Sequence, residues 1–308
     1  MVLMIQSIKN LGRGAALALF ILGGALFALG AAACATNAGG PTPSDRVSVI
    51  TTVYPLEYLV RRIGGDRVSV TNLTPPGWEP HTWEPSPADL ASIQRAQVFI
   101  YNGAGFEPWA QRVVSELPGE GPIVVEASQG LELHALPDAA IHQDGTVEHL
   151  EGGLDPHVWL DPLRYAQQGE KVKQALAQAD PAGEATYAAN LAALKDELER
   201  LDQEMAQGLA SCQRDTIVVS HAAFGYLTNR YGISQLAISG LSPDVEPSPS
   251  RLREIVEHVR EVGATHIFFE TLVSPRVAET IAREVGAQTL VLNPLEGLTK
   301  EELQAGQD

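Results

Sequence analysis

The stretch TIVVSHAAFGYLTNRYGISQLAIS, residues 216–239, holds the pattern that decides the fold. A short run rich in Val and Ile (216–220) is followed by a helix-length segment ending at a glycine (221–232), and then by a second β-rich run (233–239). Strand, helix, strand units of this kind are typical of parallel sheets, because the helix returns the chain to the same end of the sheet.

The same alternation extends through both halves of the 308-residue chain. Further β-rich runs, most of them followed by segments of helical length, are RVSVITTVY, RVSVTNL, QVFIY and PIVVEAS in the first half and THIFFE and QTLVLN in the second. We therefore expect an α/β protein of two βα lobes, each with a mainly parallel sheet.

The segment between the halves predicts one long helix. Residues 181–210 begin with a proline, which suits a first helical turn, and consist mostly of strong helix formers. Apolar side chains recur there at helical spacing: Tyr187, Leu191, Leu194, Leu198 and Leu201. At 1.5 Å per residue such a helix is about 42 Å long, so we expect a rigid connector between an N-terminal lobe (46–180) and a C-terminal lobe (211–308).

Residues 1–33 predict an export signal. Lys9 and Arg13 precede the apolar run GAALALFILGGALFALGAAAC, and a basic start, an apolar centre and small residues at the end are typical of a signal peptide. An uncleaved anchor is the alternative, since the run is about the shortest length that spans a bilayer. Cys34 ends the run in a small-residue box that resembles that of bacterial lipoproteins, so we expect lipidation there, with plain cleavage near Ala33 as the alternative.

Residues 34–45, rich in Gly, Pro, Ser and Thr, suit a flexible tether between a membrane anchor and a folded body. The formal net charge of −17 and the lack of a basic patch argue against nucleic-acid binding. Cys212 is the one other cysteine, so it either lacks its partner or is a buried, inert thiol.

Histidines and other polar residues follow the predicted strands. Ligands of open α/β sheets bind outside the carboxyl ends of the strands, and the candidates at such positions are His81, His221, Glu270 and Asn293, joined by His157, which precedes a helix that Asp161 is expected to cap. Three imidazoles with an oxygen or water in the fourth position form a tetrahedral site that favours zinc, whereas a carboxylate-rich set would favour manganese.

Four segments resemble the signature segments of the substrate-binding lipoproteins of zinc and manganese ABC transporters, specifically the zinc-uptake type: PHTWEPSPADL, DPHVWLDP, SHAAFGYL and NPLEGLT. The similarity extends from about residue 47 to the end, with the segments in the family's order. It implies two βα lobes joined by a backbone helix, a metal between them, and delivery of that metal to a membrane permease. We also expect the protein to be a monomer. The implied metal ligands are His81, His157 and His221, and a histidine at 221 is typical of the zinc branch.

The chain departs from the family in two places. Asn293 stands where the family often has aspartate, and since an amide oxygen is a poorer zinc donor, the fourth position stays open among water, Glu79, Glu270 and Asn293. The family also continues into a final helix after the point where this chain stops, so the resemblance indicates a truncated C-terminal lobe. Some members carry in that helix a cysteine that would pair with Cys212.

Other histidines and the tryptophans take secondary roles. His134, His142 and His149 lie in an acidic loop (131–153), where similar proteins carry a histidine-rich loop that captures zinc; a solvated linker is the alternative. We expect His258 and His266 to be structural, and three tryptophans to wall the site: Trp78, Trp83 and Trp159.

Two other classes of protein compete with a high-affinity zinc receptor. Three histidines and a water also describe a zinc hydrolase, with Glu79 or Glu270 as a base, but the chain has neither an HExxH nor a G-x-S-x-G motif. A surface adhesin or a structural lipoprotein would not need converging histidines. The sequence therefore favours a receptor over an enzyme, with zinc over manganese as its cargo.

Overall fold

The computed structural model describes three stretches of the chain: 46–135, 153–243 and 247–306. The predicted signal peptide, Cys34 with its tether, and the loop histidines His142 and His149 lie outside these stretches. No helix within the three stretches is long and apolar enough to cross a membrane.

The first sheet has four parallel strands in the order β2-β1-β3-β4. These are β1 (Val47–Thr51), β2 (Val68–Asn72), β3 (Val98–Tyr101) and β4 (Ile123–Glu126). Alternate residues of β3 serve two cores, with Val98 and Ile100 on one face and Phe99 and Tyr101 on the other. Both faces are buried, as expected for a parallel sheet with helices on each side.

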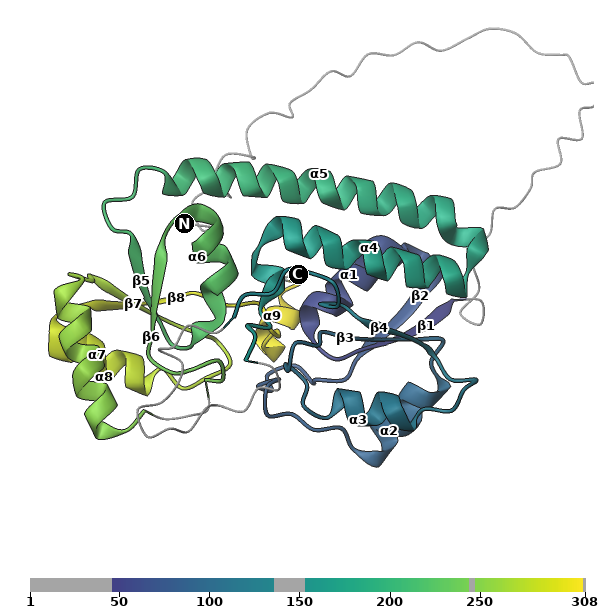
Figure 1. Ribbon diagram of the computed structural model, residues 1–308, viewed down its shortest axis with the longest axis horizontal. Helices are drawn as coiled ribbons and strands as arrows, with labels where there is room; N and C mark the ends of the chain where they lie inside the picture. The colour runs from purple at the N-terminus through teal and green to yellow at the C-terminus, as the bar shows by residue number, and fades with distance from the viewer. Residues whose placement is uncertain (1–45, 136–152, 244–246, 307–308) are drawn as a thin grey trace, which may run out of the picture. The chain divides into compact units, whose positions relative to one another are not determined.

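Helices cover both faces of this sheet (Figure 1). On one side lie α1 (Tyr54–Gly64) and α4 (Pro162–Ala179), and on the other lie α2 (Pro87–Arg95) and α3 (Ala110–Glu116). Asp161 accepts hydrogen bonds from the backbone N–H groups of Leu163 and Arg164, which confirms it as the N-cap of α4.

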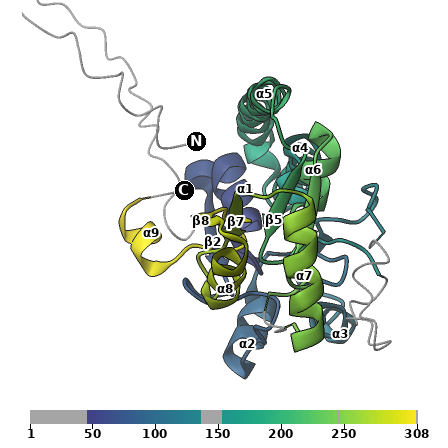
Figure 2. The same ribbon diagram turned by 90° about the vertical axis from the view of Figure 1, so that its left-hand side faces the viewer.

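The second sheet repeats the same topology, with parallel strands in the order β6-β5-β7-β8. Its strands are β5 (Thr216–Val219), β6 (Ser234–Ala237), β7 (His266–Phe269) and β8 (Gln288–Val291). They alternate with α6 (Gly225–Tyr231), α7 (Pro249–Glu261) and α8 (Arg276–Val285), and α7 and α8 bury one face of the sheet (Figure 2). The prediction of two βα lobes is confirmed.

The predicted long helix is α5 (Glu184–Leu209), which packs on α1 and α4 and reaches α6 of the second lobe (Figure 1). The helix starts three residues later than predicted, because Pro181–Gly183 form a 3-10 turn. A side chain at Gly183 would collide with Asp180, Arg67 and Tyr187, which meet there through an ion pair and hydrogen bonds. Glycine therefore permits the close packing of this corner.

The segment after β8 crosses from the second lobe to the first. Three hydrogen bonds join it to first-lobe segments: Trp159 Nε1–H to the Pro294 carbonyl (2.8 Å), the Tyr54 N–H to the Glu296 carbonyl (3.3 Å), and the Gly77 N–H to the Leu298 carbonyl (2.9 Å). The chain then forms the short α9 (Lys300–Gln304), capped by Thr299 and Glu302. The segment that follows β8 therefore lies against loops of the first lobe.

Candidate metal centre

His81 lies in the loop after β2. Its backbone N–H donates to Glu79 Oε1 (3.0 Å), and Glu79 Oε2 accepts from the N–H of Thr82 (3.1 Å). Pro80 restricts Glu79 to an extended backbone conformation, and the Glu79 carboxylate then closes a local turn over His81 and Thr82. The turn directs the imidazole inward, where its side chain is 3% exposed.

His157 lies just before the 3-10 turn η5 (Val158–Leu160) and is fully buried. Asp155, two residues earlier, accepts hydrogen bonds from both the backbone N–H and the ring Nδ1–H of His157 (2.9 and 2.8 Å). An Nδ1–H held in this way leaves the Nε2 lone pair free to bind a metal. Asp155 was not among the site residues predicted from the sequence, although it stands in the DPHVWLDP segment.

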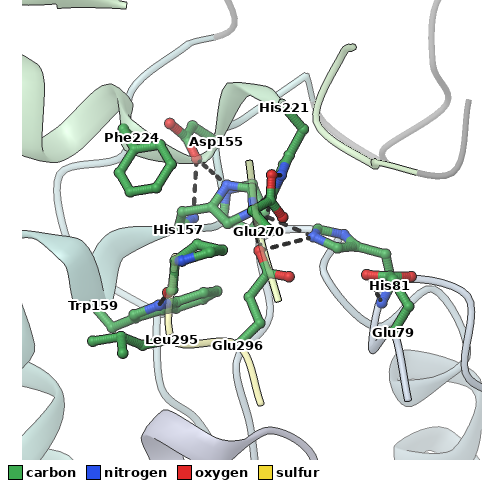
Figure 3. Close-up of polar contacts among 12 residues, drawn as sticks. Glu79, His81, Asp155, His157, Trp159, His221, Phe224, Glu270, Leu295 and Glu296 are labelled. Atoms are coloured by element: carbon green, nitrogen blue, oxygen red, sulfur yellow. Dashed lines mark hydrogen bonds and ion pairs between the residues drawn. The ribbon is translucent and has the colours of Figure 1, made fainter. Parts of the chain in front are cut away.

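His221 lies two residues beyond the end of β5 and is also fully buried. Its Nδ1 lies 2.6 Å from Oε1 of Glu270, the first residue after β7. Because β5 and β7 are neighbouring parallel strands, their carboxyl ends place the histidine and its carboxylate side by side (Figure 3). Glu270 thus supports the outer nitrogen of His221.

Glu296, which was not predicted from the sequence as a ligand, completes the cluster. It lies five residues after β8 in the segment NPLEGLT, and its side chain is 2% exposed. Its Oε1 lies 3.4, 3.2 and 3.1 Å from the Nε2 atoms of His81, His157 and His221. The preceding Leu295 has a φ of +62°, a left-handed conformation that is costly for a non-glycine residue and sets the direction of Glu296.

The four donor atoms lie within 4.8 Å of one another, and five of the six distances between them are 3.1–3.4 Å (Figure 3). Besides the three edges to Glu296, the Nε2 of His157 lies 3.3 Å from that of His81 and 3.4 Å from that of His221. A tetrahedral ion with bonds of about 2.0–2.1 Å, the values for zinc with nitrogen and oxygen, requires edges of about 3.3–3.4 Å. The cluster therefore has the dimensions of a zinc site.

The charges of the buried carboxylates also make the site favourable for a cation. Burial alone would lower the pKa of His221, but the charges of Glu296 and Glu270 outweigh it and raise this pKa to about 10. Burial would raise the pKa of Glu296, but the charges of His221 and His81 and hydrogen bonds from histidines hold it well below its usual value. Before a metal binds, a proton on His221 therefore balances Glu296, and a metal must displace it.

The fourth ligand position is not filled by any of the three residues predicted for it, because Asn293, Glu270 and Glu79 each form hydrogen bonds elsewhere. Asn293 accepts from the N–H of Leu295 (2.8 Å) and donates to Thr271 Oγ1 (3.0 Å), a turn that leads the chain into Glu296. Glu270 lies behind His221 and Glu79 bonds its own loop. The cluster of donor atoms contains Glu296 in their place.

The secondary predictions have mixed outcomes. Of the predicted auxiliary histidines, His134 stacks on the ring of Tyr226 (4.1 Å between centroids), outside the cluster. Trp159 borders the site, 5.3 Å from the ring of His157. Trp78 is 59% exposed and Trp83 packs on Trp109, so the prediction that these two wall the site was wrong.

Two other sequence predictions concern single side chains. Cys212 is free and exposed, so the interpretation of it as a buried thiol was wrong. His258 lies on α7 within 3.2 Å of Glu261, and the ring of His266 in β7 contacts Thr265. Both histidines lie outside the donor cluster.

The sequence of the chain matches the model of a known protein family. Residues 49–306 match the model of the ZnuA family, described as zinc-uptake complex component A, periplasmic. The chain belongs to this family. It is 37% identical over 267 residues to the zinc-binding lipoprotein AdcA of Streptococcus pneumoniae, covering 85% of this chain and 53% of AdcA. The chain thus spans about half the length of AdcA.

Another ZnuA-family relative is closer in length. The high-affinity zinc uptake system protein ZnuA of Bacillus subtilis is 35% identical over 288 residues, which cover 89% of this chain and 88% of that protein. Among solved structures, the Zn(II)-bound ZnuA-like domain of S. pneumoniae AdcA superimposes with a TM-score of 0.72 at 36% identity, covering 85% of this chain and 93% of the domain.

Proposed function

We propose that this chain is an extracytoplasmic, high-affinity zinc receptor that delivers Zn²⁺ to an ABC-type permease. The observation that carries the proposal is the buried cluster of His81, His157, His221 and Glu296, in which five of the six distances between donor atoms are 3.1–3.4 Å, as zinc bond lengths require. Relatives named for zinc binding and zinc uptake support it. In this proposal zinc is the transported ion, which the protein binds and then releases to the permease.

The donor set favours zinc over manganese. Imidazole nitrogens suit zinc, whereas manganese prefers carboxylate, carbonyl and water oxygens in octahedral geometry. Three of the four donor atoms here are nitrogens, and the cluster offers one carboxylate oxygen. We therefore propose that zinc binds much more tightly than manganese.

The donor set also favours a receptor over a hydrolase. Catalytic zinc sites keep one position open for water, whereas four protein ligands close the coordination sphere. The carboxylate Glu270, which could have served as a base, is bonded to His221 Nδ1. We propose no catalytic role for this site.

The receptor works outside the cytoplasm in this proposal. The signal-like residues 1–33 and the small-residue box ending at Cys34 support export and lipid anchoring, with residues 34–45 as a tether. The relative AdcA of S. pneumoniae is named a lipoprotein. We propose a monomer of two lobes, 46–180 and 211–308, joined by the helix region 181–210.

Competition titration with a zinc chelator tests the proposal. Purified apo protein should withdraw zinc from the chelator, and His81→Ala, His157→Ala, His221→Ala and Glu296→Ala should each weaken binding strongly. His258→Ala, an exposed histidine on α7, is the matched control and should bind as the wild type does. Unchanged affinity in the four variants would overturn the proposal, and so would tighter binding of manganese than of zinc.

A further inference from the structure

The three histidines of the cluster differ in what holds their outer ring nitrogen. Nδ1 of His157 bonds Asp155 (2.8 Å), and Nδ1 of His221 bonds Glu270 (2.6 Å). Nδ1 of His81 is buried and has no hydrogen-bond partner among the described residues. Metal-binding histidines ordinarily rely on such a bond for ring orientation, so something else must orient His81.

The ring of Phe106 takes that place. Its centroid lies 4.4 Å from that of the His81 ring, at an interplanar angle of 56°. Phe106 is 1% exposed and also makes edge-to-face contacts with the rings of Trp159 and His157, at 5.4 and 6.2 Å between centroids. A ring fixed on several sides can restrict the rotation of its neighbour through close packing alone.

A buried carboxylate fixes the loop that carries Phe106. In this loop, residues 103–105 all have positive φ (79°, 54° and 81°), and Ala104 is not a glycine, so the conformation needs support. Glu107 supplies it by accepting hydrogen bonds from the N–H groups of Asn102 (2.9 Å) and Gly103 (3.0 Å) and from the hydroxyl of Thr52 beyond β1.

We propose that Phe106 is a positioning residue for His81, held in place by Glu107, and that it replaces the carboxylate that orients the other two histidines. This inference rests on the proposed function, since it concerns how the zinc ligands are aligned. A carboxylate on Nδ1 raises the basicity of a ligating histidine. His81, which lacks one, is therefore aligned by packing and forms the weakest of the three metal–histidine bonds.

Phe106→Leu tests the proposal, with Phe99→Leu as its matched control. Both phenylalanines are fully buried in the first lobe, but Phe99 packs on Tyr101 and Trp109 in the core on the opposite face of the sheet. We expect Phe106→Leu to weaken zinc binding about 10-fold or more, the range for groups that support a ligand, and Phe99→Leu to lower the Tm with a change in Kd below about 3-fold, since it acts on stability alone.

A spectroscopic readout separates positioning from general destabilisation. In ring ¹⁵N NMR spectra of the zinc-loaded protein, Phe106→Leu should shift or broaden the signals of His81 and leave those of His157 and His221 in place. Unchanged His81 signals, or equal effects of Phe106→Leu and Phe99→Leu on Kd, would overturn the inference. If Phe106→Leu does not fold, Phe106→Met, whose flexible side chain fills irregular space, replaces it.

A double-mutant cycle tests whether Phe106 acts through His81. The 10-fold loss from Phe106→Leu should disappear in a His81→Ala background, and persist in a background of Glu270→Gln, which disturbs His221 instead. Persistence of the loss after His81→Ala would contradict the inference. Zinc binding by the wild type is measured first, so failure of the proposed function is seen there, separately from failure of this inference.

Glu107→Gln tests the support of the loop. The variant keeps the shape of the side chain but puts an amide donor where the carboxylate accepts several hydrogen bonds, so a donor would face a donor. We expect it to reproduce the loss of affinity and the His81 signal changes of Phe106→Leu. Wild-type affinity and His81 signals in Glu107→Gln would exclude Glu107 from the proposal.

Discussion

The two lobes share one sheet topology, yet the loops after their equivalent strands β3 and β7 support a histidine by different chemistry. In each sheet the third strand in sequence, β3 or β7, is followed by the residue that supports a histidine. After β7 this residue is Glu270, which bonds Nδ1 of His221 directly. After β3 it is Phe106, which packs on the ring of His81. Glu270 directly follows β7, whereas Phe106 lies five residues beyond β3, so the loops after equivalent strands of a repeated fold do not predict equivalent interactions.

The lobes also share a strained residue near the site. Leu295 (φ +62°) precedes Glu296 in the second lobe, and Ala104 (φ +54°) lies two residues before Phe106 in the first. Non-glycine residues in this region cost about 1–3 kcal/mol each and persist where surrounding structure holds them. In both lobes the strained residue lies just before a side chain that points toward the metal site: Glu296 after Leu295, and Phe106 after Ala104.

The largest expected losses of zinc affinity come from replacing the histidines themselves. His221→Ala should weaken zinc binding more than His81→Ala, and both should exceed the roughly 10–100-fold loss typical of supporting residues. The reason is that Glu270 strengthens the bond from His221, whereas His81 has no such partner. Chelator competition measures both constants. A larger loss from His81→Ala would reverse the comparison.

Glu270→Gln should weaken zinc binding by about 10–100-fold, because a neutral amide orients His221 less firmly and lowers its basicity. Glu261→Gln, at an exposed position of α7, provides the matched control and should have wild-type affinity. Isothermal titration with a competing chelator measures the change. An affinity within about 2-fold of the wild type would show that the carboxylate support is unimportant in the second lobe.

Zinc affinity should rise with pH, by about tenfold per pH unit for each proton that the metal displaces. The pKa of His221 is raised from 6.5 to about 10 by Glu296 and Glu270 against the effect of burial, so a proton must leave it at neutral pH. For the metal-free protein, the folded pKa exceeds the unfolded one, so the stabilisation is fully present below about pH 6.5 and is lost as the pH rises through about 10.

Chelator competition from pH 6.5 to 8.5 and denaturant unfolding of the metal-free protein check the two halves of this prediction. Glu270→Gln should flatten the pH dependence, because it removes one of the charges that raise the pKa of His221. A zinc affinity that is independent of pH in the wild type would show that no proton is displaced.

The smallest effects should come from the strained residues. Ala104→Gly and Leu295→Gly relieve an unfavourable φ but add freedom to the unfolded chain, so the free energy of unfolding should change by less than about 1 kcal/mol in either direction. Denaturant titration measures this. A loss above about 3 kcal/mol in one lobe would mean that the side chain itself, rather than the backbone conformation, holds that loop.

Sequence patterns predicted the fold well because parallel strands and helices carry their own periodicity. The alternation of β-rich and helical segments predicted both sheets, and apolar spacing predicted α5, with only the 3-10 turn at its start missed. Strand ends likewise predicted that His81 and His221 would meet, since the carboxyl ends of parallel strands form the binding edge.

Residues beyond the strand ends were harder to predict. Glu296 lies five residues after β8, and its direction depends on the φ of Leu295 and on the Asn293 turn, neither of which follows from residue pattern. Asn293 drew attention as a possible ligand, although asparagine is also a common turn former. Phe106 looks like any core residue, and only its contact with His81 distinguishes it.

Anomalous scattering at the zinc edge, from a crystal of the zinc-loaded protein, tests the central claim most directly, because it identifies both the element and its ligands. We predict one strong peak about 2.0–2.2 Å from Nε2 of His81, His157 and His221 and from Oε1 of Glu296. A peak bonded to Asn293 or Glu79 in place of Glu296, or no zinc within the cluster, would contradict it.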